Sequence, residues 1–359
     1  MLSPPLTYQG KPGGTVVVPG WRQGTGYKNG VLDGSNQAAV PLTRADAPLT
    51  RRARPTFDDD ASPPVSALAY GAVADGKTDC AAALRAALAT GRTVFLPYGY
   101  YLISSTVVVP PNGALVGELG SVLLADAAAP AFASAAAPAP LLSVPAASAG
   151  VRLVDLLFSS TGDAPGLVFL DWRATSAAPS GLWDVSWRLY HAASDLFIVT
   201  GPGAGVYWEE GWGWVADHDI DTNANLQVLN PRGRTVTGSG PSFLYGTAME
   251  HSVLYQYNFS GTGLVTTIVT QTESEYFSVP PTGWAMVHEN AATQMYGSGW
   301  YNWFNGNQSA LWTSTNSTGN AFLINVHGTN NVLVGDETIP AYTPVEEDWF
   351  CDSVAVKSF

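Results

Sequence analysis

The stretch that decides the fold is residues 70–79, which read YGAVADGKTD. A strand-like run precedes it, and Gly71 and Gly76 predict turns within it. Asp79 then stands as an N-cap before an Ala- and Leu-rich segment, which predicts a helix ending at about Thr90. The stretch therefore predicts a strand, a tight turn and one short helix.

Short strand-like runs separated by Gly and Pro corners follow the helix, beginning with residues 94–103. Similar runs recur at intervals of roughly eight to twelve residues, and no second convincing helix pattern appears. Many runs are apolar throughout, such as LVFL at residues 167–170, whereas a β-sandwich would show clean alternation. Continuous apolar strands predict parallel pairing buried on both sides, or the inward-facing stacks of a solenoid.

The composition fits one large β-rich domain with an arm. The chain has 359 residues, of which 46% are hydrophobic and 13% charged, and its 37 Gly and 25 Pro are spread along it. β-Solenoids of this length form one continuous core. We predict an extended arm or linker at residues 1–64, which are rich in Gly, Pro and charged residues, and a single β-helix domain at residues 65–359.

The charge balance excludes some classes of partner. The formal net charge is −13, and the one basic cluster is Arg51-Arg52-Ala53-Arg54. Nucleic acids require clustered Lys and Arg, so we expect no nucleic-acid partner. The 12 Trp and 15 Tyr favour a neutral sugar ligand, because aromatic faces stack on sugar rings. No apolar run has the length of a membrane span, so we expect no membrane partner.

Cysteines and sequons bear on the compartment. Cys80 and Cys351 could form a disulfide, but the sequence leaves their pairing open. Asn-x-Ser/Thr sequons at Asn258, Asn307 and Asn316 fit passage through a eukaryotic secretory pathway. The N-terminus lacks the charged and apolar regions of a signal peptide. We expect a secreted protein whose leader has been removed, or a piece of a longer precursor.

Two sets of motifs resemble known families. Residues 70–79, the helix after them and the run at 94–101 resemble the capping signature of the pectate-lyase-like superfamily. That resemblance implies an all-β fold, a right-handed parallel β-helix with one short capping helix. WGWVADHDID at 212–221, LYGTAMEHSVLYQY at 244–257 and QTESEY at 271–276 resemble glycoside hydrolase family 55. Members of that family are secreted, exo-acting β-1,3-glucanases that invert the anomeric centre.

The resemblance covers about residues 65–305 and implies half of such an enzyme. Family members carry two tandem β-helices, and this chain resembles the second, so a separate first β-helix is an expected partner beside the β-1,3-glucan substrate. The expected function is therefore a secreted glycoside hydrolase. Two alternatives stay open: a glucan-binding half-enzyme with little catalysis, and a β-helix hydrolase or lyase that acts on another polysaccharide.

The resemblance gives catalytic roles to three residues. It places the general acid at Glu273, while Tyr276 and Glu250 match a tyrosine and a second acid of the same site. Glu273 follows Glu250 by 23 residues, which fits one circuit of a β-helix, and neighbouring coils lie about 4.8 Å apart. Repulsion at that distance can raise the pKa of one carboxyl. Inverting enzymes separate acid and base by roughly 6.5–9.5 Å, so we interpret Glu250 as a pKa tuner or sugar binder.

Other residues of these motifs, with an aromatic cluster at 296–304, are expected to bind sugar or to support the groove. We expect no cofactor and no metal. Residues 217–221 alternate acids as a calcium loop does, but they lack its Gly at the sixth position and its Glu at the twelfth. The expected substrate-binding residues are Trp212, Trp214, Asp217, His218, Asp219, His251, Gln271 and Trp300.

Overall fold

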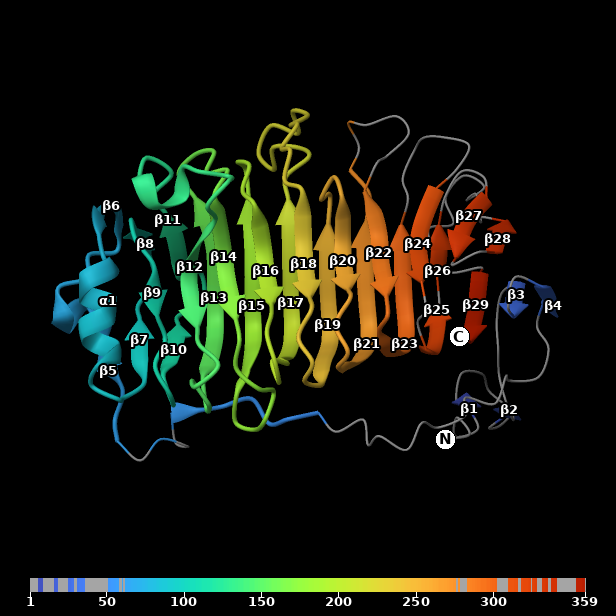
Figure 1. Ribbon diagram of the computed structural model, residues 1–359, viewed down its shortest axis with the longest axis horizontal. Helices are drawn as coiled ribbons and strands as arrows, with labels where there is room; N and C mark the ends of the chain where they lie inside the picture. The colour runs from blue at the N-terminus through green and yellow to red at the C-terminus, as the bar shows by residue number, and fades with distance from the viewer. Residues whose placement is uncertain are drawn as a thin grey trace.

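The computed structural model describes residues 51–57, 60, 62–275, 277 and 283–301, and the backbone of further strands near both ends of the chain. Strands stack along one axis, with helix α1 (Ala81–Leu88) at one end of the stack (Figure 1). Two long sheets, of 17 and 10 strands, contain nearly all of them. The predicted all-β fold, a parallel β-helix with one α-helix in the described part of the chain, is confirmed.

From β12 to β24, successive strands alternate between the two sheets, and each pairs in parallel with its equivalent one coil away. A coil is thus one strand from each sheet plus the turns that join them. The first sheet contains β13 (Arg152–Ser160), β15 (Gly181–Leu189), β17 (Tyr207–Val215), β19 (Ser242–Glu250), β21 (Leu264–Glu273) and β23 (Ala292–Tyr301). The second sheet contains β12 (Ala139–Val144), β14 (Leu167–Trp172), β16 (Asp195–Val199), β18 (Arg232–Val236), β20 (Tyr255–Phe259) and β22 (Trp284–Glu289).

The remaining elements build the first coils and the ends of the chain. The first coils contain β5 (Val65–Ser66), η2 (Ala67–Tyr70), β6 (Asp75–Asp79), β7 (Val94–Leu96), β8 (Tyr100–Ile103), β9 (Val107–Val108), β10 (Ala114–Gly117), β11 (Val122–Ala125) and η3 (Pro130–Phe132). The end strands are β1 (Leu6–Tyr8), β2 (Val16–Val18), β3 (Thr25–Lys28), β4 (Val31–Ser35), β24 (Ser309–Thr315), β25 (Thr318–Leu323), β26 (Asn325–His327), β27 (Asn331–Val334), β28 (Glu337–Pro340) and β29 (Ser353–Ser358).

The start of α1 differs by one residue from the predicted N-cap. Cys80 is the N-cap and makes no side-chain capping bond, whereas Asp79 belongs to β6. The Asp79 carboxylate still accepts a hydrogen bond from the N–H of Ala81, at 3.1 Å, and from the hydroxyl of Ser104, at 2.7 Å. Asp79 therefore satisfies one of the free N–H groups of the helix while it ties the helix to the neighbouring strand.

Aromatic rings fill the interior where the coils are widest. Trp187 stacks on Phe158 and Phe197, with ring centroids 5.3 and 5.5 Å away, and meets Trp208 edge to face. Arg234 lies fully buried beside them, its guanidinium carbon 4.5 Å from the centroid of Phe197. Burial lowers the pKa of Arg234 to about 9, because no carboxylate offsets the loss of hydration.

A line of residues with positive φ crosses the first sheet. These residues lie in register on neighbouring coils. For example, Glu209 pairs with Tyr245 and Gly211 with Thr247, which places Glu210 opposite Gly246. Each of these residues bends its strand at the equivalent position of the ladder, so the coils that contain them turn a corner there. This αL column consists of Asp155, Asp184, Glu210, Gly246, Val269 and Gly297, with φ between 51° and 69°.

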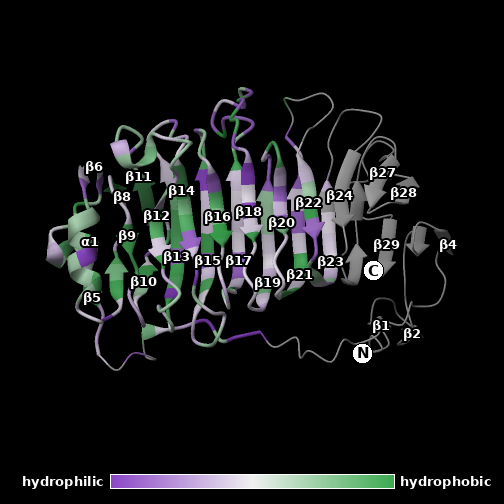
Figure 2. Cartoon of the chain, viewed as in Figure 1, coloured by the Kyte–Doolittle hydropathy of each residue, from purple (hydrophilic) through white to green (hydrophobic). Residues whose placement is uncertain are grey.

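Several expectations can be placed on this fold. Figure 2 shows apolar residues along the strands and a hydrophilic loop next to β17 and β18. Cys80 is free and buried, and Cys351 lies outside the described residues. In the described part of the chain, no helix has the length and apolar character needed to cross a membrane. The division of the chain at residue 64 stays a prediction.

Candidate active site

The predicted acid pair lies in register on adjacent coils. Glu250 ends β19, Glu273 ends β21, and the two residues face each other across the parallel ladder. The same row continues to Trp214 on β17 and to Tyr301 on β23. The spacing of 23 residues is therefore one coil, as the sequence predicts.

Glu250 is held by two donors at the edge of the sheet. It is 8% exposed, and Nε1 of Trp212 donates to its Oε2 over 2.8 Å. Gln271, two residues before Glu273 on β21, also bonds its carboxylate. Burial raises the pKa of Glu250, while the nearby His251 and the bonds from Trp212 and Gln271 oppose that rise. Glu250 therefore retains a proton more readily than a carboxyl in water.

The carboxylate of Glu273 lies near that of Glu250 and the ring of His251. One carboxylate oxygen of Glu273, one of Glu250 and one ring nitrogen of His251 all lie within 4.8 Å of one another. The carbonyl of Glu273 also accepts a bond from the N–H of His251, at 2.9 Å. His251 adopts φ 66°, a left-handed conformation that a side chain other than Gly adopts at a cost. This conformation lets one residue link the two coils and turn its ring towards both acids.

A buried aspartate lies behind His251. Nδ1 of His251 donates to the carbonyl of Val215, at 2.8 Å, which leaves Nε2 facing Asp217 Oδ2 at 3.6 Å. The other oxygen of Asp217 contacts Nδ1 of His218 at 2.7 Å, and the Asp217 side chain is fully buried. Asp217, His218 and His251 thus form one polar network beside the acid pair.

The two predicted tryptophans of β17 have different surroundings. Trp212 is 37% exposed, whereas Trp214 is 3% exposed and packs against Tyr190 and the guanidinium of Arg188. Their ring centroids lie 5.6 Å apart. A Cβ on the intervening Gly213 would lie 2.2 Å from the sulfur of Met249, so the absence of a side chain there leaves room for that methionine. Trp212 offers the open aromatic face, and Trp214 supports it.

The acid-rich loop after β17 is closed on itself. Asp219 accepts bonds from the N–H groups of Asp221 and Thr222, at 3.0 and 2.7 Å, and these bonds lower its pKa. Among the described residues, Glu250, His251 and Glu273 are the donors that lie close enough to share a metal ion. The two carboxylates of that group are also the acid pair.

Two predicted site residues cannot be placed fully. Tyr276 lies outside the described residues, and for Trp300 the structure describes the backbone alone, which pairs with Thr272. Tyr301, within the aromatic cluster predicted at 296–304, continues the row of acids. Glu209, a buried acid on β17, was not predicted, and nothing in the sequence marks it as buried.

The first coils match a family model described as rhamnogalacturonase A/epimerase, pectate lyase-like, over residues 65–135. A probable glucan endo-1,3-beta-glucosidase of Arthroderma benhamiae is 31% identical over 265 residues, 64% of this chain and 30% of that protein. A glucan 1,3-beta-glucosidase of Cochliobolus carbonum is 25% identical over 311 residues, 75% of this chain and 39% of that protein. The chain thus spans well under half the length of either relative.

A solved structure shares the fold. SacteLam55A from Streptomyces sp. SirexAA-E matches with a TM-score of 0.53 and 18% identity, over 78% of this chain and 53% of that one. A variant of the same protein in complex with glucose matches with a TM-score of 0.51 and 17% identity.

Proposed function

We propose that this chain, whose predicted resemblance to the β-1,3-glucanases of glycoside hydrolase family 55 is confirmed, is the site-bearing part of a glycosidase that cleaves β-1,3-glucan. One observation carries the proposal: two carboxylates in register on adjacent coils lie beside an exposed tryptophan. Glycosidic hydrolysis uses acidic residues beside the scissile bond, and an aromatic face suits a sugar ring. Exo action and secretion are parts of the proposal that the resemblance implies.

In the proposed mechanism Glu273 protonates the leaving oxygen of the glucan. Its carboxylate is only partly buried and so can reach substrate, whereas Glu250 is almost enclosed. The raised pKa of Glu250 favours its protonated form relative to a carboxyl in water. We therefore assign Glu250 a supporting part beside Glu273.

The short distance between the acids limits the part that Glu250 can play. Inverting glycosidases leave roughly 6.5–9.5 Å between acid and base for the attacking water. Here the two carboxylates approach within 4.8 Å, so Glu250 is too near Glu273 to activate a water between them. We propose that inversion uses a water held elsewhere in the groove. Proton NMR of the first product tests this: initial α-glucose is expected, and initial β-glucose would instead make Glu250 a nucleophile.

The acid assignment is tested by Glu273→Gln. The amide keeps the shape but cannot donate the proton, so sugar release from laminarin should fall by at least about 10²-fold. Circular dichroism should show an unchanged fold. Glu289→Gln, at the exposed end of β22, is the matched control and should keep full activity. Normal activity of the Glu273 variant would remove this residue from the mechanism.

A second candidate function follows from the length comparison. Because the chain spans 30% and 39% of its two relatives, groups that hold the attacking water could lie outside it. The chain would then bind laminari-oligosaccharides without releasing reducing sugar. Calorimetric binding combined with a reducing-sugar assay on the unaltered chain separates the two functions, and a panel of other polysaccharides tests the substrate class.

A further inference from the structure

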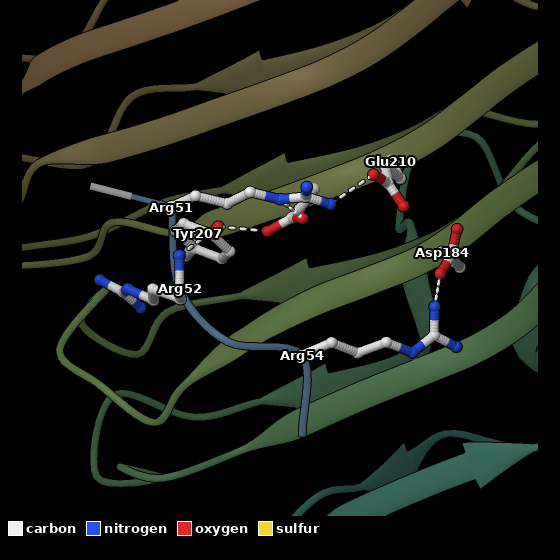
Figure 3. A network of polar contacts seen from close by, with 7 residues as sticks. Arg51, Arg52, Arg54, Asp184, Tyr207 and Glu210 are labelled. Atoms are coloured by element: carbon white, nitrogen blue, oxygen red, sulfur yellow. Dashed lines mark hydrogen bonds and ion pairs between the residues drawn. The ribbon is translucent and has the colours of Figure 1, made fainter. Parts of the chain in front are cut away.

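The basic cluster of the arm lies on a cluster of acids on the β-helix. Three residues of the αL column, Asp155, Asp184 and Glu210, carry carboxylates on three successive coils. Together with Glu209 we call these four residues the acidic bend. Figure 3 shows Arg51, Arg52 and Arg54 of the arm reaching across it.

Arg54 joins two coils with one guanidinium. Its two terminal nitrogens form ion pairs with Asp155 of β13 and Asp184 of β15. The αL conformation puts both carboxylates at the corner of the sheet, one coil apart. A guanidinium presents several donors in a fixed plane, which suits two acceptors at this spacing.

Arg51 neutralises a buried acid. Glu209 is 3% exposed; one of its oxygens pairs with Nε of Arg51 and the other accepts the hydroxyl of Tyr207. A second nitrogen of Arg51 contacts Glu210 at 2.5 Å. The arm thus supplies both part of the cover over Glu209 and its counter-ion, and the Tyr207 hydroxyl is its other partner in these contacts.

Arg52 is held by neutral groups between the two ion-paired arginines. Its backbone N–H donates to the Tyr207 hydroxyl at 2.9 Å, and its guanidinium lies 4.4 Å from the centre of that ring. The same guanidinium donates to the carbonyls of Ser180, at 2.7 Å, and Ser176. Side-chain and backbone bonds together fix the course of the arm.

The contact continues towards the helical end of the stack. Further along the arm, Asp60 pairs with Arg152 of β13 and accepts the hydroxyl of Thr93 at 2.7 Å. The arm thus touches the coils of β17, β15, β13 and β7 in turn (Figure 1). In a solenoid each coil otherwise contacts only its neighbours. A segment that crosses several coils couples elements that would unfold separately.

We propose that the acidic bend is a docking surface for a basic extended strand, occupied in this chain by Arg51–Arg54, and that docking fastens the coils of β13, β15 and β17 together as an ionic staple. The ion pairs are expected to contribute unequally to the free energy of docking. Arg54 is 42% exposed and its pairs are screened by water, so each contributes little alone. Arg51 is itself 64% exposed, but the side chain of its partner Glu209 is only 4% exposed, so we expect the Glu209 pair to contribute more than those of Arg54.

The first test removes three of the four charges of the bend, all but that of Glu210, without altering the arm. The test uses the triple variant Asp155→Asn/Asp184→Asn/Glu209→Gln. Each substitution keeps the shape of the side chain and removes its charge, and asparagine also tolerates the positive φ of Asp155 and Asp184. Trypsin should then cut after Arg51 and Arg52 at least about tenfold faster, which corresponds to a loss of about 1.4 kcal/mol of docking free energy. The bond after Arg54 precedes Pro55 and resists trypsin. Asp163→Asn, an exposed acid in the loop after β13, is the matched control.

The second test uses the Arg51–Glu209 pair, in which the carboxylate is buried and the arginine is exposed. Arg51→Gln removes the counter-ion of the Glu209 carboxylate, so the Tm of this variant should fall by about 3–6 °C. The double variant Arg51→Gln/Glu209→Gln should recover much of that loss. Added salt should speed cleavage of the unaltered arm. An unchanged cleavage rate in the triple variant, or a double variant no more stable than Arg51→Gln, would overturn the proposal. Neither readout depends on glucan hydrolysis.

Discussion

Trp212 has two separable tasks at the site. Its indole N–H donates to Glu250, and its partly exposed ring faces the side on which we place the sugar. Replacement by Phe keeps an aromatic face and removes the donor, so kcat on laminarin should fall about 10-fold or more, while KM changes little. Steady-state kinetics on laminarin measure the split.

Trp212→Ala is the comparison for that experiment. It removes the donor and the aromatic face together, so KM should rise in addition to the loss of kcat. Equal kinetic constants for the Phe variant and the unaltered chain would show that the bond to Glu250 has no role in catalysis. If the chain binds glucan without cleaving it, calorimetric affinity for laminari-oligosaccharides replaces KM.

Sequence reasoning could place the acids but could not describe their surroundings. The separation of Glu250 and Glu273 predicts adjacency because a β-helix coil has a nearly constant circuit. Trp212 and Trp214 share a face of β17 and look equivalent in sequence, yet Arg188 and Tyr190 cover only the second ring. That cover comes from the preceding coil, which no local pattern reveals.

At the scale of the strand, the αL column contains one residue that does not suit it. Val269 has φ 51° and is 59% exposed, although β-branched residues avoid this conformation. Asn adopts it more readily, so Val269→Asn should raise the free energy of unfolding by about 1 kcal/mol. Chemical denaturation followed by tryptophan fluorescence would show the midpoint moving upward with an unchanged slope.

An exposed valine with ordinary backbone geometry gives the control for Val269. Val108 of β9 is 49% exposed and has no positive φ. Val108→Asn should be neutral or destabilising, because Asn is a poor strand residue. A loss of stability at Val269 equal to that at Val108 would mean that the bend imposes no strain on its side chain.

The elements themselves could be predicted better than the corners that join them. Apolar runs such as that of β14 indicate parallel strands, and the Gly and Pro between them indicate turns. The bend within each strand of the first sheet was not predicted, because Asp, Glu, Val and Gly occupy equivalent places in it. The αL conformation at these positions is set by stacking on the neighbouring coil, so the positions share no residue type that a sequence pattern could identify.

For the whole molecule, acid should weaken the fold through His288. This residue is fully buried on β22, contacts the hydroxyl of Thr293, and burial lowers its pKa to about 4. In the unfolded chain a histidine titrates near about 6.5. Between these values the unfolded state binds more protons, so the free energy of unfolding falls as the pH drops from about 6.5 to 4, by on the order of 3 kcal/mol.

The raised pKa values of Asp195 and Glu250 act in the opposite direction, since their folded forms hold protons more tightly and lose that advantage as pH rises. A single curve of stability against pH therefore mixes these groups, and only a difference between variants isolates the histidine. His288→Gln should flatten the curve between pH 6.5 and 4 relative to the unaltered chain. His191→Gln, whose ring is 41% exposed, should leave it parallel. Parallel curves for His288→Gln as well would mean that the buried ring binds protons between pH 6.5 and 4 just as it does in the unfolded chain, and the acid sensitivity would then have to come from other groups.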